Sequence, residues 1–181
     1  MKNKKKIVYI GLSADILHAG HINIIKTASK FGKVVAGLLT DQAIATYKPI
    51  PTLNYRQREI ILKNIKQVSK VIPQHTLDYR PNLNLIKPNF VLHGDDWRTG
   101  VQKETRGQVI LTLRKWGGKL IELKYSKDIS SSLIKSKVMN LTTPTNRISI
   151  LQRLLNSKKI IRVLESHSPL SGLITENTEI I

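Results

Sequence analysis

Short apolar runs alternate with amphipathic stretches through most of the chain, and this alternation limits the fold more than any other feature of the sequence. Runs rich in β-branched residues predict strands, and stretches with apolar residues three or four positions apart predict helices. The predicted strands lie at 6–12, 34–39, 71–72, 89–93 and 119–123. The predicted helices lie at 20–31, 54–68 and 105–116. This alternation is typical of an α/β fold, and we expect a Rossmann-like, doubly wound parallel sheet with helices on both faces.

Composition excludes several other classes of protein. The chain has 181 residues, of which 40% are hydrophobic, with only ten Gly and seven Pro, so it is neither disordered nor fibrous. It contains no Cys, which excludes disulfides, thiolate zinc sites and a cysteine nucleophile. The apolar run after the basic start ends at Ser13, and no run approaches the roughly 18 apolar residues that a membrane span requires. We therefore expect a cytoplasmic protein that is neither secreted nor membrane-spanning.

The charge is strongly unbalanced, because 30 Lys and Arg oppose 12 Asp and Glu and give a net charge of +18. This excess calls for an anionic partner, either a nucleic acid or a small phosphorylated substrate. The lysines are scattered along the whole chain, and neither an RNA-module aromatic signature nor a zinc-finger spacing occurs. We therefore expect no nucleic-acid partner and interpret most of the basic residues as a solvated surface.

The strongest functional signal lies between the first predicted strand and the first predicted helix, in Gly11-Leu-Ser-Ala-Asp15-Ile-Leu-His18-Ala-Gly20-His21. His18 and His21 are three residues apart at the helix start, so both imidazoles can face one point beyond the strand end. Gly20 lets an anion approach the backbone, and the helix N-terminus offers it free N–H groups. These features suit the α-phosphate of a nucleotide, whose developing negative charge two His donors can stabilise. A zinc site would need a third protein ligand, and the other histidines supply none in an obvious position.

Five motifs in a fixed order carry a resemblance to a known family. They are Asp15-Ile-Leu-His18-Ala-Gly20-His21, Leu39-Thr40-Asp41, Tyr55-Arg-Gln-Arg58, His93-Gly94-Asp95-Asp96-Trp97 and Ile129-Ser130-Ser131-Ser132-Leu-Ile-Lys135. From about residue 7 to residue 138 the chain resembles nucleotidyltransferases with an HxGH signature, among them the cytidylyltransferases that act on glycerol 3-phosphate, phosphocholine or phosphoethanolamine. The family usually has Arg-Thr-x-Gly before its last motif, whereas this chain has Tyr125-Ser126-Lys127-Asp128.

The resemblance implies a role for each matching residue. His18 and His21 would stabilise the transition state at the α-phosphorus. Lys48 would bridge the phosphates of nucleotide and acceptor, and Arg58 would hold the acceptor. Asp15 would lie near Mg²⁺ carried by the triphosphate of CTP. The residues implied in nucleotide binding are Gly11, Leu12, Ser13, Asp15, Gly20, Gly94, Asp96, Trp97, Ile129, Ser130, Ser131, Ser132 and Lys135.

A further resemblance concerns the acceptor. The segments 47–51, 77–83 and 93–106 are similar to the cytidylyltransferase domain that is fused to phosphoenolpyruvate mutases of phosphonate biosynthesis. We therefore expect a nucleotidyltransferase domain at 1–139, a linker at 140–146 and the truncated start of a mutase-like barrel at 147–181, with a helix near 148–155 and a strand at 160–164. The magnesium and substrate residues of a mutase would lie beyond this segment, so we expect no mutase activity from this chain.

The resemblance implies an enzyme that transfers CMP from CTP to a small phosphonate, such as 2-aminoethylphosphonate, with release of pyrophosphate. Several alternatives stay open: glycerol 3-phosphate or phosphoethanolamine as acceptor, ATP as the nucleotide, a basic polyanion-binding domain, and a non-catalytic fragment of a mutase fusion. The oligomeric state is open as well, with a homodimer as one option.

Overall fold

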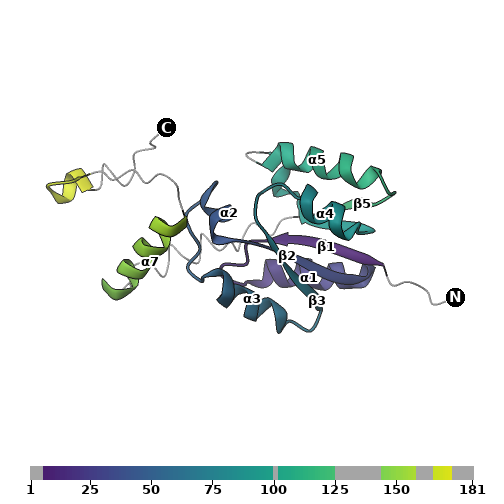
Figure 1. The fold of residues 1–181 in the computed structure, drawn as a ribbon, viewed down its shortest axis with the longest axis horizontal. Coiled ribbons are helices and arrows are strands. Elements are labelled where there is room, and N and C mark those ends of the chain that lie inside the picture. Colours follow the sequence, from purple (N-terminus) through teal and green to yellow (C-terminus); the bar gives the residue numbers. More distant parts are fainter. Residues whose placement is uncertain (1–5, 100–101, 125–143, 158–164, 173–181) are drawn as a thin grey trace.

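The computed structural model describes residues 6–99, 102–124, 144–157 and 165–172. Five strands form one sheet: β1 (Ile7–Leu12), β2 (Lys33–Leu39), β3 (Val68–Gln74), β4 (Phe90–Gly94) and β5 (Lys119–Leu123). Their order is β3-β2-β1-β4-β5, and every adjacent pair is parallel (Figure 1). The predicted α/β fold with a parallel sheet is therefore confirmed.

Helices cover both faces of this sheet because the side chains of the central strand point alternately to either side. Val8 and Ile10 of β1 join a core beneath α1 (Ala19–Phe31) and α3 (Tyr55–Lys63). Tyr9, between them in sequence, joins the opposite core beneath α4 (Arg80–Ile86) and α5 (Lys103–Arg114). Figure 1 shows the two helix pairs on opposite sides of the strands.

Several short or peripheral elements lie outside the sheet and its four covering helices, among them a helical turn at 169–172. The helix α2 (Asp41–Ala45) follows β2, and the 3₁₀ helix η1 (Asp95–Arg98) follows β4. The helix α7 (Pro144–Ser157) lies against α2 (Figure 1) and confirms the helix predicted near 148–155. It begins at Pro144, inside the range predicted as a linker. The strand predicted at 160–164 lies outside the described residues.

Three predicted boundaries are wrong: the end of α3 and both ends of β3. The helix predicted at 54–68 ends at Lys63, and β3 already begins at Val68 rather than at residue 71. Apolar residues continue at helical spacing beyond Lys63, so the sequence does not reveal where the helix ends. In the structure residues 64–67 form a turn, which closes with a bond from the N–H of Val68 to the carbonyl of Ile65. β3 also continues through Pro73, because β3 is an edge strand, where a missing N–H can be tolerated.

The short helices α2 and α4 are among the elements that were not predicted. Thr40 caps α2 through its hydroxyl, which accepts the N–H of Ala43 at 3.2 Å. The α4 segment contains Pro and two Asn and has weak helical propensity, but Leu83 is fully buried in the core above the sheet. Tertiary packing thus stabilises a helix that local sequence does not favour. No helix among the described residues is long and apolar enough to cross a membrane.

Candidate active site

The candidate site lies beyond the carboxyl end of the central strand. The chain passes from β1 outward through β2 and β3 and then returns to β4 on the other side of β1, so the switch point lies between β1 and β4. Ligands of open α/β sheets bind in the crevice at such a point. The loop from Ser13 to His18 follows β1, and η1 follows β4. The fold therefore brings two of the five motifs to one edge of the sheet.

The two histidines cap the start of α1 with their ring nitrogens. His18 is the N-cap residue, and its Nδ1 accepts the N–H of Gly20 at 3.2 Å. In return, His21 Nδ1 accepts the N–H of His18 at 3.4 Å, which completes a capping box. An imidazole nitrogen that accepts a hydrogen bond carries no proton, so the proton of each neutral ring is on Nε2. The cap thus leaves each histidine with an Nε2–H donor, and the ring centroids lie 4.0 Å apart.

Both histidines are held in the neutral form. Burial lowers the pKa of His18 below its ordinary value. Burial, and then the nearby charges of His18 and Lys48, lower the pKa of His21 to about 4. Near pH 7 the two rings therefore carry no positive charge and act as hydrogen-bond donors.

Lys48 supplies the positive charge beside the histidines. Its Nζ donates to Ser13 Oγ at 3.0 Å and lies 5.2 Å from the centroid of the Tyr47 ring. Its backbone N–H bonds to the carbonyl of Ile44, so the end of α2 positions it. The structure thus brings together Ser13, His18, His21 and Lys48, which the sequence analysis assigned to the site, although Lys48 is 27 or more residues from the other three in the chain.

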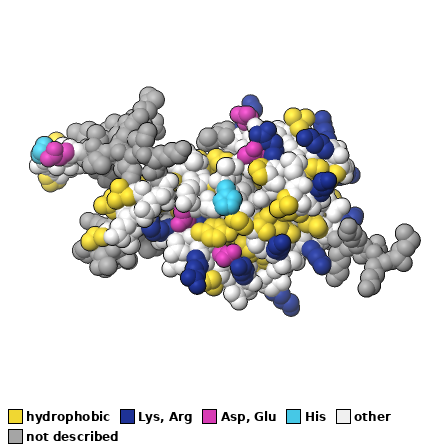
Figure 2. All heavy atoms as spheres, in the orientation of Figure 1, with side chains coloured by type: hydrophobic (Ala, Val, Ile, Leu, Met, Phe, Trp, Pro, Cys, Tyr) yellow, Lys and Arg dark blue, Asp and Glu magenta, His cyan; other side chains and the backbone are white. Residues whose placement is uncertain are grey.

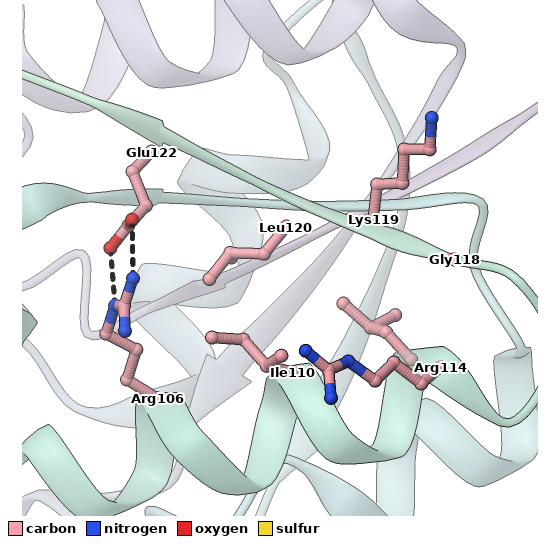
Figure 3. Close-up of a pocket in the computed structure, with 8 residues that line it drawn as sticks. Arg106, Ile110, Arg114, Gly118, Lys119, Leu120 and Glu122 are labelled. Atoms are coloured by element: carbon pink, nitrogen blue, oxygen red, sulfur yellow. Dashed lines mark hydrogen bonds and ion pairs between the residues drawn. The ribbon is translucent and has the colours of Figure 1, made fainter.

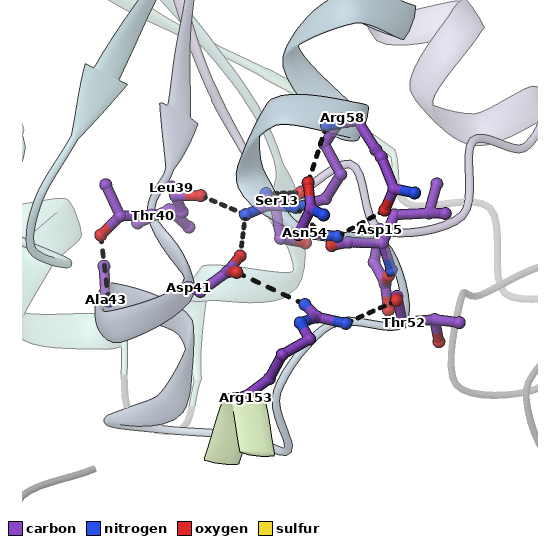
Figure 4. A network of polar contacts seen from close by, with 12 residues as sticks. Ser13, Asp15, Leu39, Thr40, Asp41, Ala43, Thr52, Asn54, Arg58 and Arg153 are labelled. Carbon is purple, nitrogen blue, oxygen red and sulfur yellow. Dashed lines mark hydrogen bonds and ion pairs between the residues drawn. The ribbon is translucent and has the colours of Figure 1, made fainter. Parts of the chain in front are cut away.

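Arg58 requires a correction, because its guanidinium is not available to an acceptor in this structure. Its side chain is fully buried. Its Nε donates to the Leu53 carbonyl at 3.1 Å, one terminal nitrogen donates to the Ser13 carbonyl, and the other donates to the Leu39 carbonyl at 2.8 Å and to Asp41 Oδ1 at 2.7 Å (Figure 4). Arg58 therefore joins three loops around the site instead of reaching into it.

Asp15 is also a bracing residue here rather than an evident ligand of Mg²⁺. It is 3% exposed, and its Oδ1 accepts the N–H of Leu53 at 3.0 Å. Among the described residues, no group of three His, Asp or Glu side chains is placed to hold a metal ion.

The two glycines of the first motif, Gly11 and Gly20, lack a side chain for different physical reasons. A Cβ on Gly11 would overlap the Tyr79 hydroxyl, and the adjacent Leu12 is a core residue, so both positions serve packing of the sheet rather than evident nucleotide contact. A Cβ on Gly20 would lie 3.0 Å from two atoms of the His18 ring. Gly20 is thus the position that lets the His18 ring fold over the helix start.

In the loop after β4, the predicted nucleotide-binding residue Trp97 is buried and the predicted nucleotide-binding residue Asp96 is exposed. Trp97 is 1% exposed, stacks on His93 with ring centroids 3.8 Å apart, and donates from Nε1 to Glu122 at 2.9 Å. It therefore anchors the loop. The Asp96 side chain is 45% exposed, and its carboxylate remains accessible beside the partly buried His93. The carbonyl of Gly94 accepts a hydrogen bond from His93 Nδ1 at 2.9 Å, which orients the strand end.

Glu122 of β5 gathers the donors behind this loop. Its carboxylate accepts from Trp97, from Arg98 at 2.9 Å and from Arg106 at 2.8 Å. These bonds, with Arg106 the strongest, hold the pKa of Glu122 well below its usual range. Figure 3 shows the Arg106 pair at one end of a pocket of about 360 Å³ between α5 and β5, whose other end carries Arg114 and Lys119. The lining includes none of the predicted site residues, so this pocket is separate from the histidine pair.

Sequence reasoning missed Tyr79 and Glu122 as residues that build the site, and it named Asp41 in a motif without giving it a role. Asp41 stands directly after β2, so its position at a strand end was a usable signal. Tyr79 and Glu122 act through contacts 68 and 25 residues away in the chain, with Gly11 and Trp97, and no local pattern reveals them. The predicted nucleotide-binding residues Ile129, Ser130, Ser131, Ser132 and Lys135 lie outside the described residues.

The basic residues do not join into one patch on the face seen in Figure 2. There the Lys and Arg side chains of the described residues are spread around the molecule, with acidic side chains among them. This distribution agrees with the interpretation of most lysines as a solvated surface.

Comparison with known proteins decides the family. A family model described as "Cytidylyltransferase-like" matches residues 9–137, which include both histidines and the loop after β4. The chain belongs to the cytidylyltransferase-like family. It is 29% identical over 143 residues to an ethanolamine-phosphate cytidylyltransferase of Dictyostelium discoideum, across 76% of this chain and 38% of the relative. It is 32% identical over 97 residues to a glycerol-3-phosphate cytidylyltransferase of Bacillus subtilis, across 51% of this chain and 73% of the relative.

The family assignment agrees with the fold of solved structures. A lipopolysaccharide core biosynthesis protein of Thermoplasma volcanium superposes with a TM-score of 0.57 at 23% identity, over 70% of this chain and 100% of that protein. This likeness concerns the fold. The chain spans 38% of the length of the Dictyostelium enzyme and 33% of an ethanolamine-phosphate cytidylyltransferase of Arabidopsis thaliana, so it corresponds to a part of those cytidylyltransferase-like relatives.

Proposed function

We propose that this protein transfers CMP from CTP to a small acceptor that bears a phosphate or phosphonate group, with release of pyrophosphate. The observation that carries the proposal is the capping box of α1, which fixes both histidines as neutral Nε2–H donors beside a lysine. Family membership supports the same chemistry, since the Dictyostelium, Bacillus and Arabidopsis relatives are all named cytidylyltransferases.

The residues of the site match the charge that develops in this reaction. An acceptor oxygen attacks the α-phosphorus in line, a new P–O bond forms, and the bond to the bridging oxygen of the β-phosphate breaks. His18 and His21 donate hydrogen bonds to the α-phosphate oxygens as negative charge grows there. We assign to Lys48, whose Nζ bonds to Ser13 Oγ beside the histidines, the role of bridging both phosphate groups and offsetting their repulsion. The acceptor oxygen is already ionised near neutral pH, so the reaction needs no general base.

Magnesium enters this proposal with the nucleotide. Mg²⁺ neutralises the charge of a triphosphate and of the departing pyrophosphate when it is bound. The described residues do not form a cage for it, and Asp15 spends one carboxylate oxygen on the Leu53 N–H. We therefore propose Mg²⁺ as a companion of CTP and assign no residue of this chain as its ligand.

For the acceptor we propose 2-aminoethylphosphonate or a related two-carbon phosphonate. The sequence resemblance to domains fused to phosphoenolpyruvate mutases favours this class. 2-Aminoethylphosphonate and phosphoethanolamine differ only by one bridging oxygen, and the Dictyostelium relative is named for the second compound. A site for one is therefore close in shape and charge to a site for the other, and their discrimination is a matter of experiment.

A competition assay tests both the nucleotide and the acceptor. The full chain is incubated with Mg²⁺, with CTP or ATP, and with an equimolar mixture of 2-aminoethylphosphonate, phosphoethanolamine and glycerol 3-phosphate, and the products are identified by mass spectrometry. We expect a CMP adduct of the phosphonate in excess over the two phosphate esters and no AMP adduct. A predominant adduct of either ester would overturn the phosphonate assignment while leaving the transfer reaction in place.

A further inference from the structure

The helix α7 reaches the site through one side chain, Arg153. One terminal nitrogen of its guanidinium donates to the Thr52 carbonyl at 2.6 Å, and the other lies 3.4 Å from Asp41 Oδ2. The partner oxygen of that carboxylate, Oδ1, accepts from Arg58 at 2.7 Å. Figure 4 shows Asp41 between the two guanidinium groups. Each oxygen of Asp41 thus binds a different arginine, one from α3 and one from α7.

Lys48 directly precedes the segment that receives the bond from Arg153. Residues 49–54 connect Lys48 to α3 and are held at Thr52 by Arg153, and at Leu53 by Asp15 and Arg58. The Leu53 N–H donates to Asp15, and the Leu53 carbonyl accepts from Arg58. The contacts of Leu53 with Asp15 and Arg58 come from the nucleotidyltransferase fold itself. The contact of Thr52 comes from a helix about 100 residues further along the chain.

The contacts of Arg153 are better suited to fixing a position than to adding stability. Its side chain is 22% exposed, yet its Nε is buried and has no hydrogen-bond partner among the described residues. An unpaired buried donor costs free energy that offsets much of what the pair with Asp41 contributes. A residue kept in such a position is more readily explained by the geometry it imposes on its neighbours.

We infer that Arg153 is a positioning residue for the proposed transfer reaction, and that α7 braces the Lys48 segment from outside the nucleotidyltransferase fold. The inference rests on the proposed function for its kinetic consequence. Without Arg153 the segment loses its hydrogen bond at Thr52, and Asp41 keeps Arg58 but loses its contact with α7. Lys48 is then held less firmly against Ser13. Misplacement of a substrate-binding group by about 1 Å can cost up to ~100-fold in rate.

Kinetics of a double-mutant cycle test this role. The full chain is made as R153A, K48A and the double variant, with R56A as a matched control, since Arg56 is exposed on α3. We expect R153A to lower kcat/KM for CTP about tenfold, mainly through KM, and R56A to change it less than twofold. In the K48A background the further loss on adding R153A should be less than twofold, because Arg153 acts through Lys48. An equal loss in both backgrounds, or no loss in either, would overturn the inference.

Two further measurements separate this role from simple folding and from failure of the proposed function. R153K keeps the charge and one donor direction, so kcat/KM should recover to within about threefold of the wild type if position is what matters. Amide exchange of Leu53, followed by NMR, should be faster in R153A than in R56A, because the Leu53 bond to Asp15 opens more often. If the wild-type chain shows no turnover, the proposed function fails, and unchanged exchange at Leu53 would independently overturn the brace.

Discussion

His18 and His21 use opposite sides of their rings for two purposes. The Nδ1 atoms close the first turn of α1, and the Nε2 atoms are left as donors at the sheet edge. A helix cap, which is ordinarily a matter of stability, here fixes the tautomer that the proposed chemistry requires. The same pair of bonds therefore links local folding to function.

Substitutions at His18 separate the capping role of Nδ1 from the donor role of Nε2. Asn places an acceptor atom near the position of Nδ1 and is a favoured N-cap, whereas Ala has none. We expect H18A to lower the free energy of unfolding by about 1 kcal/mol and H18N by less than ~0.5 kcal/mol, measured by urea denaturation. Equal destabilisation by the two variants would show that the ring does not act as a cap.

The pH dependence of stability reports the buried His21. Its pKa is about 4 in the folded protein, against an ordinary value near 6.5 when unfolded. Above pH 6.5 His21 is neutral in both the folded and the unfolded protein, and the free energy of unfolding is at its full value. As pH falls towards 4, the unfolded chain binds the proton first, so the free energy of unfolding falls. We expect the free energy of unfolding to drop by about 3 kcal/mol more in the wild type than in H21N between pH 7.5 and 4. Parallel pH profiles for the two proteins would contradict the depressed pKa.

At the scale of elements, Gly20 and Gly107 make a matched pair of helical glycines. A Cβ on Gly20 would meet the His18 ring at 3.0 Å, whereas a Cβ on Gly107 in α5 would meet nothing within 4 Å. We expect G107A to raise the free energy of unfolding by about 0.5–1 kcal/mol without affecting turnover. G20A should lower kcat/KM about tenfold, because the ring must shift away from its capping position. The prediction fails if G20A turns over substrate as fast as G107A.

The elements also show how far the sequence can be interpreted on its own. The strands of the parallel sheet and α1, α5 and α7 could be predicted because their apolar periodicity is strong over many residues. α4 could not, because packing of Leu83 on the sheet outweighs a weak local preference. β3 was predicted too short, since Ser69 and Lys70 lie on an exposed edge strand that shows little apolar alternation.

The candidate site was predictable where a motif is local and not where it depends on tertiary contacts. The HxGH segment contains both its donors and its own cap, so residue spacing alone indicated the arrangement of His18 and His21. Arg58 was placed at the acceptor because a motif match gives a residue type but not its surroundings. Its partners Ser13, Leu39 and Asp41 come from two other loops, and together they bury the guanidinium.

For the whole molecule, the net charge of +18 makes the salt dependence of catalysis informative. Between 0.05 and 0.5 M KCl the screening of exposed charges increases strongly, so the attraction of CTP to the protein weakens. We expect KM for CTP to rise several-fold, roughly three to ten times, with kcat changed less than twofold. A random DNA duplex at low salt should not compete with CTP. Strong competition by the duplex would favour a polyanion-binding surface instead.

The central claim is that the neutral histidine pair serves transfer of CMP, and one assay tests it most directly. Pyrophosphate release is measured with CTP, Mg²⁺ and 2-aminoethylphosphonate or phosphoethanolamine for the wild type, H18N and H75N, where His75 is an exposed histidine outside the site. The account predicts turnover by the wild type and H75N, and a loss of about 100-fold or more in H18N, the effect of removing one transition-state donor. Turnover by H18N at the wild-type rate would contradict it.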